Sequence, residues 1–159
     1  MNLTLTLTDE MQSALQTSAK DAGLDANVHA ARIVEDYLLA QDGLVADDTK
    51  QDVLLARSLI ERAVEEALAI VRANGFASSI TFDAIQAVSA TDAWLADYRT
   101  LVRDDPYKTG NPRKQTINQN LGYYIKKAVG ARSQTKADGK AVNAKVKGSI
   151  IQSYTPLTM

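Results

Sequence analysis

Most of the residue types that carry enzymatic chemistry are missing from this sequence or stand alone. The chain has no cysteine and a single histidine, His29, which excludes a thiol nucleophile, a disulfide framework and a histidine-rich metal site. Glu61 and Glu65 share a helical face but have no histidine partner, and Tyr154 lacks the set of placed cations that a nucleophilic tyrosine requires. We therefore expect no enzymatic activity, no metal and no cofactor.

Charge is distributed unevenly along the 159 residues, although the formal net charge is only −1. Residues 1–50 carry a net charge of −6 and residues 51–99 carry −3, whereas residues 100–159 hold eleven basic and three acidic residues, a net charge of +8. Such a split indicates that a polyanion, if one binds, docks on the C-terminal third.

One predicted helix in this third places amide and basic side chains on a single face. It should begin at Gln115 or Thr116 and run to about Val129, with Ile117, Leu121, Tyr124, Ile125 and Val129 buried on the other side. Asn and Gln side chains recognise adenine in the major groove, and cations just before a helix meet phosphates. The DNA-binding residues predicted here are Arg113, Lys114, Gln115, Asn118, Gln119, Tyr123, Lys126 and Lys127.

A basic β-hairpin is predicted after this helix. Asp138-Gly139 indicates a two-residue turn, and residues 142–150 alternate between apolar and polar, with Gly148 as a bulge and an extension to Thr155. A helix followed by a basic hairpin is the order of a winged helix, which we take as an architectural analogy. The DNA-binding residues predicted in this segment are Arg132, Lys136, Lys140, Lys145 and Lys147.

The middle of the chain predicts helices that would form a core. Residues 41–50 are typical of a linker, a long helix should follow from about 49 to 74, and Gly75 should end it. A further helical stretch from Thr81 should break near 89–91 and end before Asp104-Asp105-Pro106. The predicted fold is mainly α with short β, divided into residues 1–40, the linker 41–50 and a helical domain 51–159.

The N-terminal residues alternate strictly, which predicts a half-buried strand over residues 2–8. Thr8 should cap a helix that ends at Gly23, and Asp25 should start a second helix. About 40 residues with one strand enclose too little core and leave the strand unpaired. The simplest remedy is a second copy of the chain, so that two strands pair across a two-fold axis.

Residues 2–40 resemble the ribbon-helix-helix family of DNA-binding proteins. The resemblance rests on the alternating strand, the helix ending at Gly23, and the spacing from there through Asp25 to Ile33 and Leu38. It implies an obligate dimer in which outward strand residues enter the major groove and the second helix holds a phosphate at its N-terminus. The implied DNA-binding residues are Asn2, Thr4, Thr6 and Asn27, with the backbone amides near Asp25 and Ala26, and the dimerisation residues are Leu3, Leu5, Leu7, Ile33 and Tyr37.

The leading functional hypothesis is therefore a homodimeric protein that binds double-stranded DNA and acts as a transcriptional regulator or repressor by occupying its site. The alternative is an antitoxin-like protein, or a phage- or plasmid-borne inhibitor, that binds a protein partner. The sequence shows neither a signal peptide nor an apolar segment of about 20 residues, so we expect a cytoplasmic protein without membrane contact.

Overall fold

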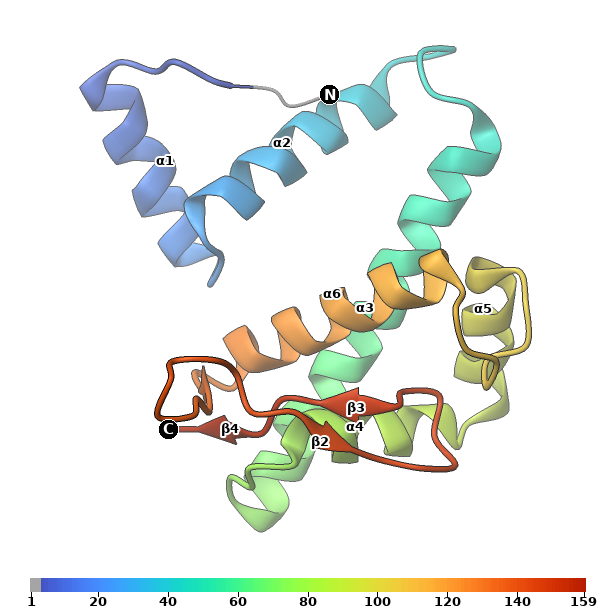
Figure 1. Cartoon of the computed structure of the whole chain (residues 1–159). Coiled ribbons are helices and arrows are strands. Elements are labelled where there is room, and N and C mark those ends of the chain that lie inside the picture. Colours follow the sequence, from blue (N-terminus) through green and yellow to red (C-terminus); the bar gives the residue numbers. More distant parts are fainter. Residues whose placement is uncertain (1–3) are drawn as a thin grey trace. The chain divides into compact units, whose positions relative to one another are not determined.

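The computed structural model describes residues 4–159, and these form a mainly helical chain with short antiparallel strands near the C-terminus (Figure 1). The predicted mainly helical class with short β is confirmed. The chain divides into two compact units, Met1–Lys50 and Gln51–Met159. The elements are α1 (Asp9–Asp21), α2 (Ala26–Ala40), α3 (Asp47–Asn74), α4 (Ile80–Ser89), α5 (Asp92–Val102), α6 (Pro112–Ala128), β1 (Arg132–Ser133), β2 (Ala144–Lys145), β3 (Ser153–Tyr154) and β4 (Leu157–Thr158).

The first unit is a pair of helices that pack on each other. Thr8 caps α1 by accepting a hydrogen bond from the amide of Met11, and Gly23 follows its end with a φ of +67°. Asp25 precedes α2 but makes no side-chain capping hydrogen bond. The hydroxyl of Ser18 lies 2.8 Å from Nε2 of His29, which links the two helices. The predicted limits of both helices are thus confirmed.

The segment before α1 does not form the strand that its alternating pattern predicts. Residues 4–8 have no strand structure, and Asn2 and Leu3 lie outside the described residues. Leu5 is exposed and Leu7 is half-buried. A β-strand is stabilised by hydrogen bonds to a neighbouring strand, and residues 4–50 contain none that could pair with it.

The second unit begins in α3, which starts at Asp47 within the predicted linker 41–50 and ends before Gly75, where φ is +82°. The predicted break near 89–91 separates α4 from α5. The end of α5 is set by Arg103, whose left-handed φ of 56° stops the helix before the predicted Asp104-Asp105-Pro106 signal.

Helix α6 starts one turn earlier than predicted. The side chain of Asn111 accepts a hydrogen bond from the amide of Lys114, and Pro112 occupies the first helical position. Both are standard signals for the start of a helix. The cap provides an acceptor for a backbone N–H group that has no partner within the helix, and proline has no N–H group that would need one. The predicted start at Gln115 or Thr116 did not take these two signals into account.

The core of the second unit combines all four of its helices with the C-terminal segment. The indole nitrogen of Trp94 donates to the carbonyl oxygen of Leu59 at 3.1 Å, and the Trp94 and Tyr98 rings stack with centroids 5.2 Å apart. The buried apolar residues are Leu59, Ile60, Ala63, Ala67, Ile80, Ala84, Ile85, Val88, Trp94, Tyr98, Leu101, Val102, Ile117, Leu121, Ile125, Ile150, Ile151 and Leu157.

The C-terminal segment folds back twice instead of forming one long returning strand. The first reversal is a three-residue connection, 137–139, closed by two hydrogen bonds of Lys136 and by Gly139 with φ +78°. The predicted two-residue turn is therefore wrong, and the geometry is that of a bulged turn. The second reversal, at residues 147–150, brings β3 alongside β2, so Gly148 lies in a turn and not in a bulge.

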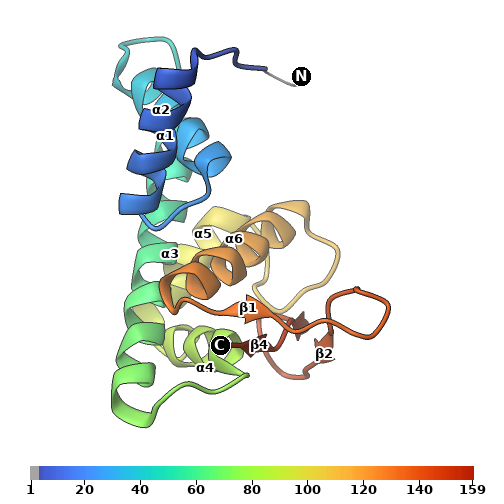
Figure 2. The same cartoon turned by 90° about the vertical axis from the view of Figure 1, so that its left-hand side faces the viewer.

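This second reversal has a physical cause in the pair Ile150 and Ile151, which are both buried. Neighbouring side chains of a strand point to opposite faces, so a strand with one solvent-facing side cannot bury both. The chain leaves the sheet at this point, and β4 then pairs with β1 while the amide of Leu157 donates to the carbonyl of Ser78. In both views the strands lie beside α6 and α4 (Figures 1 and 2).

The burial of α6 gives a direct stability test. Leu121 is fully buried, whereas Leu54 on α3 is 53% exposed. We expect Leu121→Ala to lower the free energy of unfolding by about 2–5 kcal/mol, because it removes buried methyl groups and leaves a cavity. The same change at Leu54 should cost under about 0.5 kcal/mol. Urea unfolding followed by Trp94 fluorescence measures both, and equal losses would contradict this packing.

Candidate nucleic-acid interface

The predicted DNA-binding residues belong to two separate units. Thr4, Thr6 and Asn27 are exposed in the first unit, and Asn2 lies outside the described residues. The predicted residues between Arg113 and Lys147 all belong to the second unit. The first unit supplies hydroxyl and amide groups, and the second supplies the positive charge.

Four cations of the C-terminal segment stand on the surface without an acidic partner. Arg132, Lys136, Lys145 and Lys147 are exposed, and within residues 4–159 none of their side chains forms an ion pair. Lys140, also exposed, lies 3.9 Å from a carboxylate oxygen of Asp138. This surface therefore keeps most of its positive charge available to an external anion.

Two other cations of the second unit, Arg103 and Arg113, share one acidic partner. One carboxylate oxygen of Asp52 accepts hydrogen bonds from Arg103 at 3.0 Å and from Arg113 at 2.8 Å. The hydrogen bond from Arg113 does most to hold the pKa of Asp52 below its usual value, so the carboxylate stays charged. Arg113, predicted to contact DNA, instead holds the start of α6 to α3.

Lys114 was predicted to contact DNA at the surface, but its side chain lies inside the fold. Only 5% of the residue is exposed, and its ammonium donates to the carbonyl oxygen of Lys108 at 2.8 Å. Burial lowers the pKa of Lys114, because a desolvated ammonium is less stable than a hydrated one, and the nearby carboxylates of Asp104 and Asp105 oppose this shift. A surface contact between Lys114 and a duplex is thus excluded.

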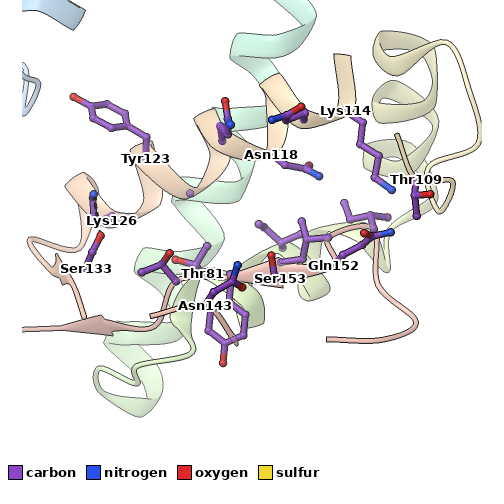
Figure 3. A pocket seen from close by; sticks show the side chains of 18 of the residues that line it. Thr81, Thr109, Lys114, Asn118, Tyr123, Lys126, Ser133, Asn143, Gln152 and Ser153 are labelled. Carbon is purple, nitrogen blue, oxygen red and sulfur yellow. Dashed lines mark hydrogen bonds between the residues drawn. The ribbon is translucent and has the colours of Figure 1, made fainter. Parts of the chain in front are cut away.

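The polar face of α6 borders a groove of about 590 Å³ (Figure 3). The C-terminal segment forms the opposite wall, and Figure 3 shows Asn143, Gln152 and Ser153 facing α6 across it. Six of the predicted DNA-binding residues line this groove, namely Lys114, Gln115, Asn118, Gln119, Tyr123 and Lys126. The face expected to project into a major groove is therefore one wall of a concavity.

The groove has a definite chemical character. No Asp or Glu lines it and two lysines do, whereas Ile85, Ile150 and Ile151 lie at its floor and are almost completely buried. Lys126, at one end, donates to the hydroxyl of Ser133 at 3.3 Å. Such a lining favours a ligand that has hydrogen-bonding edges and negative charge.

Asn118 connects the groove to the core. Its side-chain oxygen accepts a hydrogen bond of 2.7 Å from the hydroxyl of Tyr98, whose ring is fully buried. Burial raises the pKa of Tyr98, so the hydroxyl keeps its proton and remains a donor. This bond fixes which way the amide of Asn118 points, and its nitrogen remains to serve as a donor.

Two features of the site were missed from the sequence. The wall formed by Asn143, Gln152 and Ser153 was assigned to a continuous strand, and the adjacent Ile150-Ile151 pair was the available signal that the chain turns inward. Lys127, one of the predicted DNA-binding residues, has its ammonium 5.9 Å from the centroid of the Tyr123 ring and does not line the groove.

Within residues 4–159, no cluster of carboxylates and imidazole is placed to hold a metal ion.

Gly122 provides a test of the open space beside α6. A Cβ added there would meet only the methyl group of Thr81, at 4.0 Å. We expect Gly122→Ala to raise the free energy of unfolding by about 0.5–1 kcal/mol, because alanine stabilises a helix interior relative to glycine. The control Gly130→Ala should lower stability, since φ there is +69°. Thermal unfolding of both variants measures this, and a loss at Gly122 would show that the space is filled.

Comparison with known proteins adds no relative to this description. No protein-family model matches the sequence, and neither a curated protein nor a solved structure matches the chain. None of the helices within residues 4–159 has the length and apolar character needed to cross a lipid bilayer. The function proposed for this chain thus depends on its own residues and their geometry.

Proposed function

We propose that this chain is a homodimeric protein that binds double-stranded DNA and regulates transcription by occupying its site. The observation that carries the proposal is the set of exposed cations without acidic partners on the C-terminal segment, Arg132, Lys136, Lys145 and Lys147. Phosphate neutralisation by such side chains dominates the affinity of proteins for DNA.

The arrangement of these cations also supports DNA binding. They follow α6 in the chain and surround a hairpin whose tip is formed by residues 137–139. In winged helices, which share this order of elements, the hairpin contacts phosphates that flank the groove entered by the helix. Because the polar face of α6 lines a concavity, the duplex contact proposed here is made by the hairpin and the neighbouring strands.

Dimerisation is supported by the incomplete core of the first unit. Within residues 4–50 only Ala19 is buried, while Met11, Ile33 and Tyr37 are 57%, 49% and 64% exposed. Leu5, Leu38 and Leu44 are also exposed. So many exposed large apolar side chains in about 50 residues are typical of a surface that a partner covers. A second copy would cover these side chains and would give the alternating N-terminal segment a strand to pair with, as the ribbon-helix-helix resemblance implies.

The second candidate function, a module that binds a different protein, is favoured by the same apolar surface. Leu5, Ile33 and Tyr37 would then contact a foreign partner instead of another copy. The two candidates differ in solution mass, because only self-association doubles the 17.2 kDa of one chain.

The first prediction from this proposal concerns salt. Affinity for duplex DNA should fall steeply with salt, and each of Lys136→Gln, Lys145→Gln and Lys147→Gln should reduce the slope of log K against log salt by about 1. Fluorescence anisotropy with a labelled duplex at several salt concentrations measures the slope. Lys20→Gln, an exposed lysine of α1, is the control and should leave it unchanged. An affinity independent of salt would exclude this mode of binding.

The second prediction concerns the dimer. Light scattering should give about twice 17.2 kDa for the full chain, and Ile33→Glu should return the mass to that of one chain, because it places a charge in the proposed interface. Ala73→Glu adds the same charge at an exposed position of α3 in the second unit, so it should leave the dimer intact. A monomeric wild-type chain at micromolar concentration would disprove self-association.

A further inference from the structure

The groove between α6 and the C-terminal segment has no role in the duplex contact proposed above. It is concave, lined by amide and hydroxyl groups over apolar side chains, and bordered by Lys114 and Lys126. We infer that this groove binds a short segment of single-stranded nucleic acid. The inference depends on the proposed function only in taking nucleic acid as the ligand.

The length of the groove favours a strand over a single small molecule. Lys114 and Lys126 are twelve positions apart on α6, which corresponds to about 18 Å along the helix axis. Successive phosphates of one strand are about 3.4 Å apart along a stacked helix. One nucleotide cannot reach both lysines, whereas a strand of a few nucleotides places a phosphate near each.

The lining matches the bases of an unpaired strand. Gln115 and Gln119 line the groove on α6 and Gln152 lines it on the opposite wall, and each amide offers both a donor and an acceptor. In single strands the Watson–Crick edges are free to meet such groups, whereas in a duplex they are occupied.

Lys114 gives the groove a buried charge that an anion would compensate. Its ammonium has three donors, and within residues 4–159 the carbonyl of Lys108 is the acceptor that it contacts. The residue is 5% exposed, and Figure 3 shows its side chain running from α6 toward Thr109 at the edge of the groove. A phosphate at this end would accept hydrogen bonds from the remaining donors of the ammonium.

The test blocks the groove without disturbing the core. Gly122→Leu should place a side chain between α6 and Thr81, where the nearest heavy atom to an added Cβ is 4.0 Å away. Ala128→Leu adds bulk to an exposed position of the same helix outside the groove and is the matched control. Circular dichroism and thermal unfolding confirm that both variants fold before binding is measured.

Anisotropy with labelled single-stranded DNA and RNA octamers of mixed sequence is the readout. We expect the full chain to bind at least one octamer, Gly122→Leu to weaken that binding at least tenfold, and Ala128→Leu to change it less than twofold. A nucleoside monophosphate should compete at least tenfold more weakly than the unlabelled octamer. The inference is overturned if Gly122→Leu binds the octamer as tightly as the wild-type chain does, or if the mononucleotide competes as well as the unlabelled octamer. It is also overturned if the wild-type chain binds neither octamer.

A duplex of the same sequence separates this inference from the proposed function. Gly122→Leu should leave duplex affinity within twofold, because the duplex contact is assigned to the exposed lysines. If the wild-type chain does not bind the duplex but binds the octamer, and Gly122→Leu weakens octamer binding, the duplex proposal is disproved and the single-strand inference is supported. If the wild-type chain binds the duplex and Gly122→Leu does not weaken octamer binding, the single-strand inference is disproved and the duplex proposal is supported.

Discussion

The burial of one side of α6 is the constraint on which the second unit depends. Ile117, Leu121 and Ile125 recur at every fourth position and are almost completely buried, so they fix the rotation of the helix about its axis. The opposite side, which holds Gln119 and Tyr123, must then face away from the helical core. The C-terminal segment meets this side only at its edges, and the groove is the space that remains.

The two units differ in how completely they bury their apolar residues. The second unit encloses Trp94, Tyr98 and a continuous set of aliphatic side chains, and it uses its own last residues to do so. The first unit leaves large apolar side chains exposed around two helices. This difference agrees with the scaling of surface with size, because about 50 residues enclose little interior. The chain thus combines a unit that encloses an apolar core with a unit whose large apolar side chains stay exposed.

The helices could be predicted from the sequence because their signals are local. The capping by Thr8, the stop at Gly75 and the break near 89–91 follow from periodicity and from single residues with special backbone preferences. The groove could not be predicted in the same way. The alternation over 142–150 is the same whether the chain continues or turns back, and only the contact of Ile150 and Ile151 with distant helices decides between them.

The charges of the site could also be predicted only in part: their place along the chain could be predicted, but their partners could not. The sequence placed the positive charge in the C-terminal third, and the structure keeps most of it exposed there. No pattern in the sequence indicates that Arg113 pairs with Asp52, 61 positions away, or that the side chain of Lys114 is buried. Charge pairing depends on distances between elements, which a one-dimensional pattern does not contain.

The bulged hairpin has a consequence for the way this surface responds to an anion. The backbones of Lys136 and Lys140 are joined at 2.7 Å across the base of the turn, so two like charges stand on neighbouring positions of the hairpin, with Asp138 near only one of them. Like charges on facing positions destabilise a hairpin. A phosphate placed between these lysines would attract both of them and offset their mutual repulsion, so the tip of the hairpin should be more rigid with an anion bound than without one.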